Sequence, residues 1–198
     1  MLLKKVSEKD KLHDVIECLT YAMEAKDPYT SGHSSRVADM TYDIAVNMGI
    51  RGRNLEIIHL AAHLHDIGKI GISEAILNKK TKLLPEEWEL IKKHPEIGYN
   101  ILNKSKHMKD IAKIVLHHHE RWDGKGYPQG LRQYEIPLGS RIIAVADSID
   151  AMTYSRPYRT ALSWEECKTE INVNSGIQFD PSVVAAVNTA CKDWKVIA

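Results

Sequence analysis

Apolar residues recur at intervals of three and four along most of this chain, and no other feature constrains its fold as strongly. This spacing places them on one face of an α-helix, whose period is 3.6 residues. No segment shows the alternation of apolar and polar residues that is typical of a strand. The sequence therefore predicts an all-α fold, a compact multi-helix domain. The expected helices span residues 12–23, 30–47, 54–66, 85–91, 95–102, 109–119, 138–154, 164–173 and 181–194, with a short segment at 74–77.

Residues that cap or interrupt helices separate these segments. The pair Asp27-Pro28 ends the first helix, because the residue before a proline disfavours helical geometry. Thr30 or Ser31 can cap the second helix through a side-chain oxygen. Residues 121–137 are rich in glycine and proline, so we expect a structured loop there rather than a regular element.

Length and composition indicate one globular domain that spans residues 1–198. The 27 basic and 26 acidic residues nearly cancel, which argues against DNA as a partner because DNA-binding domains are usually basic. Neither a signal peptide nor an apolar run of membrane-spanning length is present. The three cysteines are widely separated and show no metal-ligand or redox spacing, so we expect a reducing, cytoplasmic location.

The adjacent pair His65-Asp66 is the first candidate for metal binding. It ends an apolar helix, where an ionised aspartate needs a partner because little water reaches it. A divalent cation is such a partner, and histidine with carboxylate suits iron, manganese, nickel or zinc. One such pair is weak support on its own, since histidines at helix ends and salt-bridged aspartates are common.

Five further residues strengthen the metal interpretation. They are His33, His94, His118, His119 and Asp147. Asp147 lies in a strongly apolar helix, where an unpaired carboxylate would be costly. Seven ligands exceed what one ion needs, whereas two ions that share Asp66 as a bridge would use them all. Centres with two metals suit in-line displacement at phosphorus.

These candidates stand within longer motifs. The motifs are DPYTSGHS at 27–34, HDIGK at 65–69, HP at 94–95, HHERWDGKGYP at 118–128, RIIAVAD at 141–147 and RPYR at 156–159. Together they resemble the HD-GYP domains, a bacterial branch of the HD superfamily that hydrolyses cyclic di-GMP. The resemblance covers the chain from about residue 10 to residue 187.

The resemblance implies a role for each candidate residue. It implies that one metal ion is held by His33, His65, Asp66 and Asp147. It implies that a second ion is held by His94, His118 and His119, with Asp66 bridging the two. Iron or manganese is most frequent in the family, with nickel and zinc as alternatives. A hydroxide between the ions would attack phosphorus, while Lys69 would contact the scissile phosphate. It also implies a nucleotide site lined by Lys69, Tyr127, Asp150, Arg156 and Arg159.

Three positions depart from the family pattern. Tyr29 stands where some members carry a carboxylate that helps to bind a third metal, so we expect two ions here. Gln133 replaces a usual glycine, and Ser155 replaces an acid that often precedes Arg156. The last two differences concern loop shape and ligand affinity rather than the metal ligands.

The remaining histidines are interpreted as structural. His59 and His63 stand four apart on one helix and are a possible zinc pair, but Leu60 occupies the place of the glutamate in the His-Glu-x-x-His pattern. Ordinary packing or surface roles are therefore favoured for both. The others, which appear isolated in the sequence, are His13, His107 and His117.

The preferred hypothesis is that water attacks one phosphodiester bond of cyclic di-GMP, giving linear pGpG, and the sequence leaves open whether cleavage continues to GMP. One rival is a module that senses the dinucleotide or docks a partner protein with little turnover, but the complete set of ligands argues against it. Another rival keeps the chemistry and changes the substrate, for instance to cyclic GMP-AMP. Further candidate partners are a diguanylate cyclase or sensor domain, and a second copy of the chain through the apolar stripe at 12–23.

Overall fold

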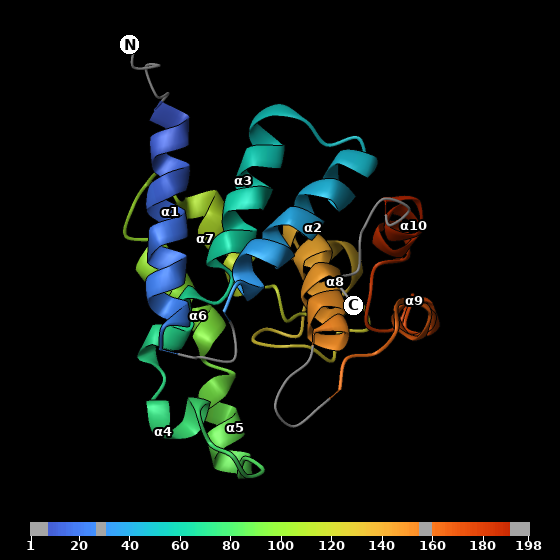
Figure 1. The fold of residues 1–198 in the computed structure, drawn as a ribbon. Coiled ribbons are helices and arrows are strands. Elements are labelled where there is room, and N and C mark those ends of the chain that lie inside the picture. Colours follow the sequence, from blue (N-terminus) through green and yellow to red (C-terminus); the bar gives the residue numbers. More distant parts are fainter. Residues whose placement is uncertain (1–7, 27–30, 155–159, 191–198) are drawn as a thin grey trace.

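The computed structural model describes residues 8–26, 31–154 and 160–190, and Figure 1 shows their arrangement. In these ranges every regular element is a helix, apart from one isolated bridge between Ser175 and Phe179. The all-α prediction is thereby confirmed. No helix in the same ranges is both long enough and apolar enough to cross a membrane. The elements are α1 (Glu8–Glu24), α2 (His33–Asn47), α3 (Gly52–Leu64), η2 (Ile67–Gly71), α4 (Glu74–Leu77), α5 (Pro85–Ile91), α6 (His94–Leu102), α7 (Lys109–Leu116), η3 (Gln133–Glu135), α8 (Leu138–Thr153), α9 (Trp164–Val173) and α10 (Pro181–Ala190), where η marks a 3-10 helix.

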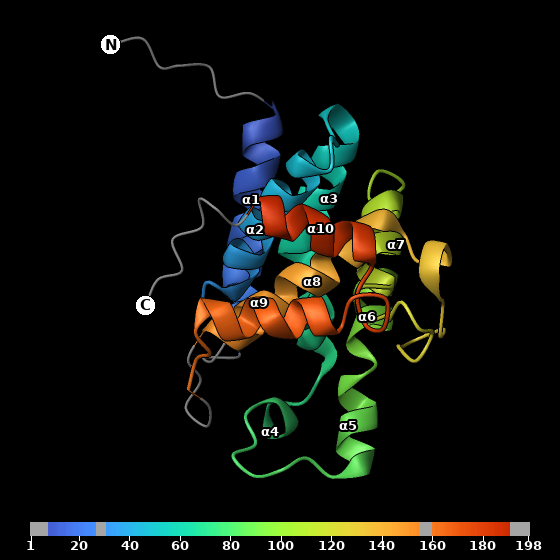
Figure 2. The same ribbon diagram turned by 90° about the vertical axis from the view of Figure 1, so that its right-hand side faces the viewer.

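Helices α3 and α8 lie at the centre of the fold, and α2 packs against both of them (Figure 1). A central helix must be apolar around most of its circumference. Helix α3 meets this requirement with Leu55, Ile58 and Leu64, and α8 with Ile142 and Ile143, all of them buried. Each such side chain contributes about 1.5–3 kcal/mol when it leaves water. Figure 2 shows α9 and α10 lying over α8. This packing fixes the C-terminal end of α3 beside α8, where the candidate ligands gather.

The apolar stripe of α1 is divided between the core and the surface. Ile16 and Met23 are buried against the rest of the domain, where α1 contacts α3 and η2. The other three apolar side chains of the stripe are exposed, namely Leu12, Val15 and Leu19. The five positions share one helical face, but only the edge of that face that carries Ile16 and Met23 is buried.

The structure corrects two predicted helix ends. Helix α2 begins at His33, after Gly32 in a left-handed conformation with φ 70°, and no side chain of its own N-terminal turn caps it. Glu24 at the end of α1 does so instead, because its carboxylate accepts hydrogen bonds from the backbone N–H groups of Gly32 and Ser34 at 2.7 and 2.9 Å. Helix α7 ends at Leu116 rather than at residue 119.

Candidate metal centre

Three histidines at the ends of helices share one hydrogen-bonding geometry. They are His65 after α3, His94 after α5 and His118 after α7. Their Nδ1 atoms lie 2.7, 2.8 and 2.6 Å from the carbonyl oxygens of Ala62, Ile91 and Val115, each three residues earlier in the chain. A carbonyl oxygen only accepts, so Nδ1 carries the hydrogen and Nε2 keeps its lone pair. The last carbonyls of a helix lack partners within it, which explains why α7 can end before its histidines.

The Nε2 atoms of these rings are aimed into the interior. All three side chains belong to the most deeply buried in the domain, with 1% of their surface exposed. The Nε2 atom of His65 has no hydrogen-bond partner in the described part of the chain. A buried polar atom without a partner is costly, and an Nε2 lone pair in such a position is a donor suited to a metal ion.

Asp66 lies between two groups of histidines. Its Oδ1 atom is 3.3 Å from Nε2 of His94, whereas its Oδ2 atom is 3.4 Å from Nε2 of His65 and 3.9 Å from Nε2 of His33. The Nζ atom of Lys69 is 2.6 Å from the same Oδ2 atom. Burial by itself raises the pKa of Asp66, but Lys69 and the histidines hold it well below its usual range. The carboxyl group is therefore ionised, with one oxygen facing each group.

The first group joins α2, α3 and α8. Nε2 of His33 lies 3.3 Å from Oδ1 of Asp147, and Nδ1 of His33 lies 2.6 Å from Oδ2 of Asp150. Burial alone lowers the pKa of His33, but the hydrogen bonds to Asp147 and Asp150 outweigh burial and raise the pKa to about 9. Asp147 keeps 22% of its side-chain surface exposed, so it opens toward solvent more than its apolar helix suggested.

The second group consists of His94, His118 and His119. The Nε2 atoms of His94 and His118 are 3.2 Å apart, and the ring centroids of His118 and His119 are 4.0 Å apart. Burial, together with the neighbouring histidines, lowers the pKa of all three and brings that of His119 to about 3. Neutral imidazoles are the form that binds metals. Each ring therefore offers a lone pair at neutral pH.

Both groups fit a divalent metal ion. In the triple His33, His65 and Asp66, and in the triple His94, His118 and His119, one donor atom from each residue lies within 4.8 Å of the others. Imidazole nitrogens with a shared carboxylate suit transition metals such as manganese, iron, nickel and zinc. The seven ligands expected from the sequence are thus brought together in one place.

The loop after α7 packs against the second group. The Tyr127 ring stacks on the His119 ring, with centroids 4.8 Å apart and planes inclined by 30°. Gly126 permits this approach, because a Cβ atom there would lie about 2.5 Å from the backbone of residues 119–121. Burial and the charges of Asp66 and Asp147 raise the pKa of the Tyr127 hydroxyl, so it stays protonated at neutral pH. The loop therefore presents an aromatic face and a hydroxyl donor beside the candidate ligands.

Some interactions of the site were not evident in the sequence. Asp150, expected in the nucleotide site, is 3% exposed and lies behind His33, where Arg36 also donates to both of its carboxylate oxygens. Glu120 accepts a hydrogen bond from the backbone N–H of Gln129 at 2.7 Å, so it braces the loop. Tyr29, Ser155, Arg156 and Arg159 lie outside the described residues.

The structure also corrects the interpretation of His13 as an isolated residue. It packs against His59 and His63, and one donor nitrogen from each ring lies within 4.8 Å of the others. The sequence signal for this cluster is the four-residue spacing of His59 and His63, matched on α1 by that of His13 and Glu17. Spacing alone cannot show that the two helix faces meet.

Comparison with known proteins places this arrangement in a family. A model of the HD domain matches residues 17–183. The chain belongs to the HD domain family. The resemblance to the HD superfamily drawn from its motifs is thereby confirmed.

This HD domain is similar to several curated proteins. It is 45% identical over 193 residues to a cyclic di-GMP phosphodiesterase of Thermotoga maritima, covering 93% of this chain and 52% of the relative. It is 37% identical to a cyclic di-GMP phosphodiesterase response regulator of Xanthomonas campestris, covering 93% and 49%. It is 40% identical to a 3'3'-cGAMP-specific phosphodiesterase of Vibrio cholerae, covering 88% and 39%. The chain thus spans about half the length of these relatives, or less.

Solved structures show the same fold at lower identity. A crystal structure of a cyclic GMP-AMP-specific phosphodiesterase of V. cholerae matches with a TM-score of 0.73 at 21% identity, covering 92% of this HD domain and 49% of that chain. The HD domain of a phosphodiesterase of L. monocytogenes matches with a TM-score of 0.59 at 20% identity, covering 87% and 94%. These matches support the all-α architecture.

Proposed function

We propose that this HD domain is a metal-dependent phosphodiesterase that hydrolyses cyclic di-GMP to linear pGpG, with further cleavage to GMP as an alternative end point. The observation that carries the proposal is the Asp66 carboxylate, which directs one oxygen toward His94 and the other toward His65 and His33. A carboxylate in this position suits a bridge between two ions. The substrate follows from the names of the curated relatives, which cover 93% of this chain in two cases.

We assign two divalent ions to the centre, with iron or manganese preferred and nickel or zinc as alternatives. The first is assigned to His33, His65, Asp66 and Asp147. The second is assigned to His94, His118 and His119, with Asp66 shared. Two such ions, when bound, lower the pKa of water and neutralise charge on a phosphodiester.

Lys69 is assigned to the scissile phosphate. Its Nζ atom reaches the buried carboxylate of Asp66 at 2.6 Å, while 21% of its side-chain surface remains exposed. The ammonium group therefore joins the centre to the solvent side, from which an anionic substrate approaches. Fixed positive charge at this place stabilises the negative charge that grows on the phosphate oxygens.

The surrounding residues receive positioning or binding roles. We assign the exposed side of the Tyr127 loop to the nucleotide, together with Arg156 and Arg159 of the RPYR motif. Asp150 is reassigned from the nucleotide to His33, because its carboxylate binds Nδ1 of that ring at 2.6 Å. A carboxylate behind a ligand histidine fixes the orientation of the ring.

The second candidate is a phosphodiesterase for 3'3'-cGAMP. It is favoured by the relative from V. cholerae that is 40% identical over 179 residues. The two substrates share the phosphodiester bonds and one guanine, so the same metal centre serves both. Competition between them at equal concentration decides which is the better substrate.

The experiment combines metal analysis with product chromatography. The protein is purified anaerobically, loaded with iron or manganese, and incubated with each dinucleotide. We expect two ions per chain at the centre and release of the linear dinucleotide. Lys69→Ala should keep its metal and lose about 100- to 1,000-fold in kcat, whereas His107→Ala, at an exposed position away from the centre, should retain full activity. Absence of hydrolysis with every metal would overturn the enzymatic proposal.

A further inference from the structure

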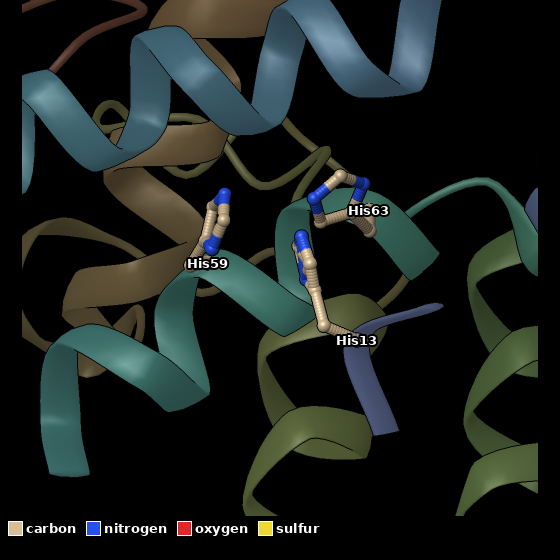
Figure 3. Close-up of side chains that lie close together, drawn as sticks. All are labelled: His13, His59 and His63. Atoms are coloured by element: carbon tan, nitrogen blue, oxygen red, sulfur yellow. The ribbon is translucent and has the colours of Figure 1, made fainter. Parts of the chain in front are cut away.

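We propose that His13, His59 and His63 form an additional zinc site, separate from the catalytic centre, which clamps α1 to α3. Figure 3 shows the three rings gathered together, His13 from α1 and His59 and His63 from α3. The ring centroid of His13 lies 5.3 Å from that of His59 and 4.9 Å from that of His63. The centroids of His59 and His63 are 4.8 Å apart.

Two helices supply three imidazole donors, and a carboxylate lies next to one of them. Residues four apart on a helix share a face, so His59 and His63 present their rings on the same side of α3. On α1 the same spacing joins His13 to Glu17, whose Oε1 atom lies 3.6 Å from Nε2 of His13. Three imidazoles with one carboxylate or water form a tetrahedral set that suits Zn²⁺.

His63 gives a second and independent indication of a ligand. Its side chain is 2% exposed, and neither of its ring nitrogens has a hydrogen-bond partner in the described ranges. A neutral imidazole carries one N–H donor and one lone pair, and burying both without partners is costly. Aromatic packing alone leaves this cost in place. A cation held by the three rings would use the lone pair.

The charge state of the cluster is compatible with metal binding. Burial lowers the pKa of His59, and the adjacent His13 ring lowers it further. The His59 imidazole is therefore neutral at pH 7 and can donate its lone pair. With zinc–nitrogen bonds of 2.0–2.1 Å, tetrahedral ligands lie about 3.4 Å apart. The nitrogens, now within 4.8 Å of one another, need to close by up to about 1.4 Å, and the rings of His13 and His59 are partly exposed.

The site is distinct from the catalytic centre although it is close in sequence. His65 stands two positions after His63, and two steps along a helix turn the side chain by about 200°. The two rings therefore project from opposite sides of the helix end. The Thr20 hydroxyl of α1 already donates to the His63 carbonyl at 3.2 Å. Zinc coordinated by the three rings would add bonds between α1 and α3 to this hydrogen bond. It would hold α1 against the helix that leads to Asp66.

The test is a zinc titration of the metal-free full chain, produced without a histidine tag. Bound metal is counted by mass spectrometry, and Co²⁺ absorption reports tetrahedral coordination. We compare the unmodified protein with His13→Ala, the matched control His107→Ala, and His118→Ala, which affects only the catalytic group. His13→Ala should lose one zinc equivalent, with at least about 100-fold weaker affinity at this site, while His107→Ala keeps it. His118→Ala should retain the tetrahedral Co²⁺ signal.

A second variant keeps the result interpretable if His13→Ala folds poorly. His59→Gln preserves the size of a part-exposed side chain, and circular dichroism confirms its helical content. Zinc should raise the Tm of the unmodified protein more than that of either variant. The proposal is overturned if His13→Ala and His59→Gln bind as many zinc ions as His107→Ala with the same rise in Tm. These readouts do not depend on hydrolysis, so a failure of the proposed phosphodiesterase activity would leave them intact.

Discussion

Replacement of Gly68 by alanine tests how the centre is held together. Gly68 is the second residue of η2, the 3-10 helix that follows Asp66, and it packs on the backbone of α6. A Cβ atom at this position would lie 1.9 Å from the carbonyl oxygen of His94 and 2.6 Å from the backbone nitrogen of Gly98. Real Cβ atoms essentially never approach closer than 3.0 Å, so the two segments must separate by about 1.1 Å. Backbone atoms cannot turn aside as a flexible side chain can.

The expected cost is about 3 kcal/mol of unfolding free energy, at the upper end of the usual range for overpacking. For a domain of this size that corresponds to a fall in Tm of about 6–12 °C. Gly71→Ala is the matched control in the same 3-10 helix, because its Cβ would meet only side-chain atoms of Ile97, at 3.0 Å and beyond. It should cost less than about 1 kcal/mol. In Gly68→Ala, the separation of η2 from α6 should also lengthen the 3.3 Å distance between Nε2 of His94 and Oδ1 of Asp66, and so weaken manganese binding.

Calorimetry of both variants, with and without manganese, measures the two effects. If Gly68→Ala and Gly71→Ala unfold within about 1 kcal/mol of each other, the close approach of η2 and α6 is not as described. Unchanged manganese affinity in Gly68→Ala would contradict the link between this packing and the centre.

Three further predictions concern single contacts. Glu24→Ala should lower the unfolding free energy by about 1–3 kcal/mol, because two backbone N–H groups at the start of α2 lose a charged acceptor; urea unfolding measures this, and no loss would exclude the cap. Asp150→Asn should lower the pKa of His33 from about 9 in the metal-free protein, because it removes a hydrogen bond to a charged carboxylate that raises this pKa. NMR titration measures the pKa, and an unchanged value would show that Asp150 does not raise it. The metal-free protein should lose stability as the pH falls from 6.5 toward 4, because His63, with a folded pKa of about 4, takes up a proton on unfolding. The loss of unfolding free energy is on the order of 1 kcal/mol per pH unit, and His63→Leu should make the dependence of stability on pH less steep between pH 6.5 and 4. An equal slope in both proteins would contradict the contribution of His63.

The all-α fold could be predicted from the sequence because helical periodicity is a local signal. Leu55 and Ile58 on α3, for instance, are three residues apart and both are buried. The candidate ligands could also be named in advance, since they stand in long motifs. Helix ends were less predictable, because they depend on distant partners. The cap on α2 comes from Glu24 of another helix, and the end of α7 depends on the bond from His118 to the Val115 carbonyl.

Contacts between helices explain the remaining differences between the sequence predictions and the structure. The resemblance placed Asp150 in the nucleotide site, because the sequence could not show that Arg36 and His33 would occupy its oxygens. In the same way, His13 appears isolated until α1 is packed on α3. Such contacts arise from tertiary packing and carry no local pattern.

Asp66 is proposed to join two metal ions in a phosphodiesterase centre. Counting bound manganese or iron, and measuring cyclic di-GMP hydrolysis in the unmodified protein and in Asp66→Ala, tests this role. We predict two ions per chain and release of pGpG in the unmodified protein, with loss of both metal and activity in the variant. Loss of activity with unchanged metal content would contradict the bridging role of Asp66, and absence of hydrolysis in the fully loaded unmodified protein would contradict the phosphodiesterase itself.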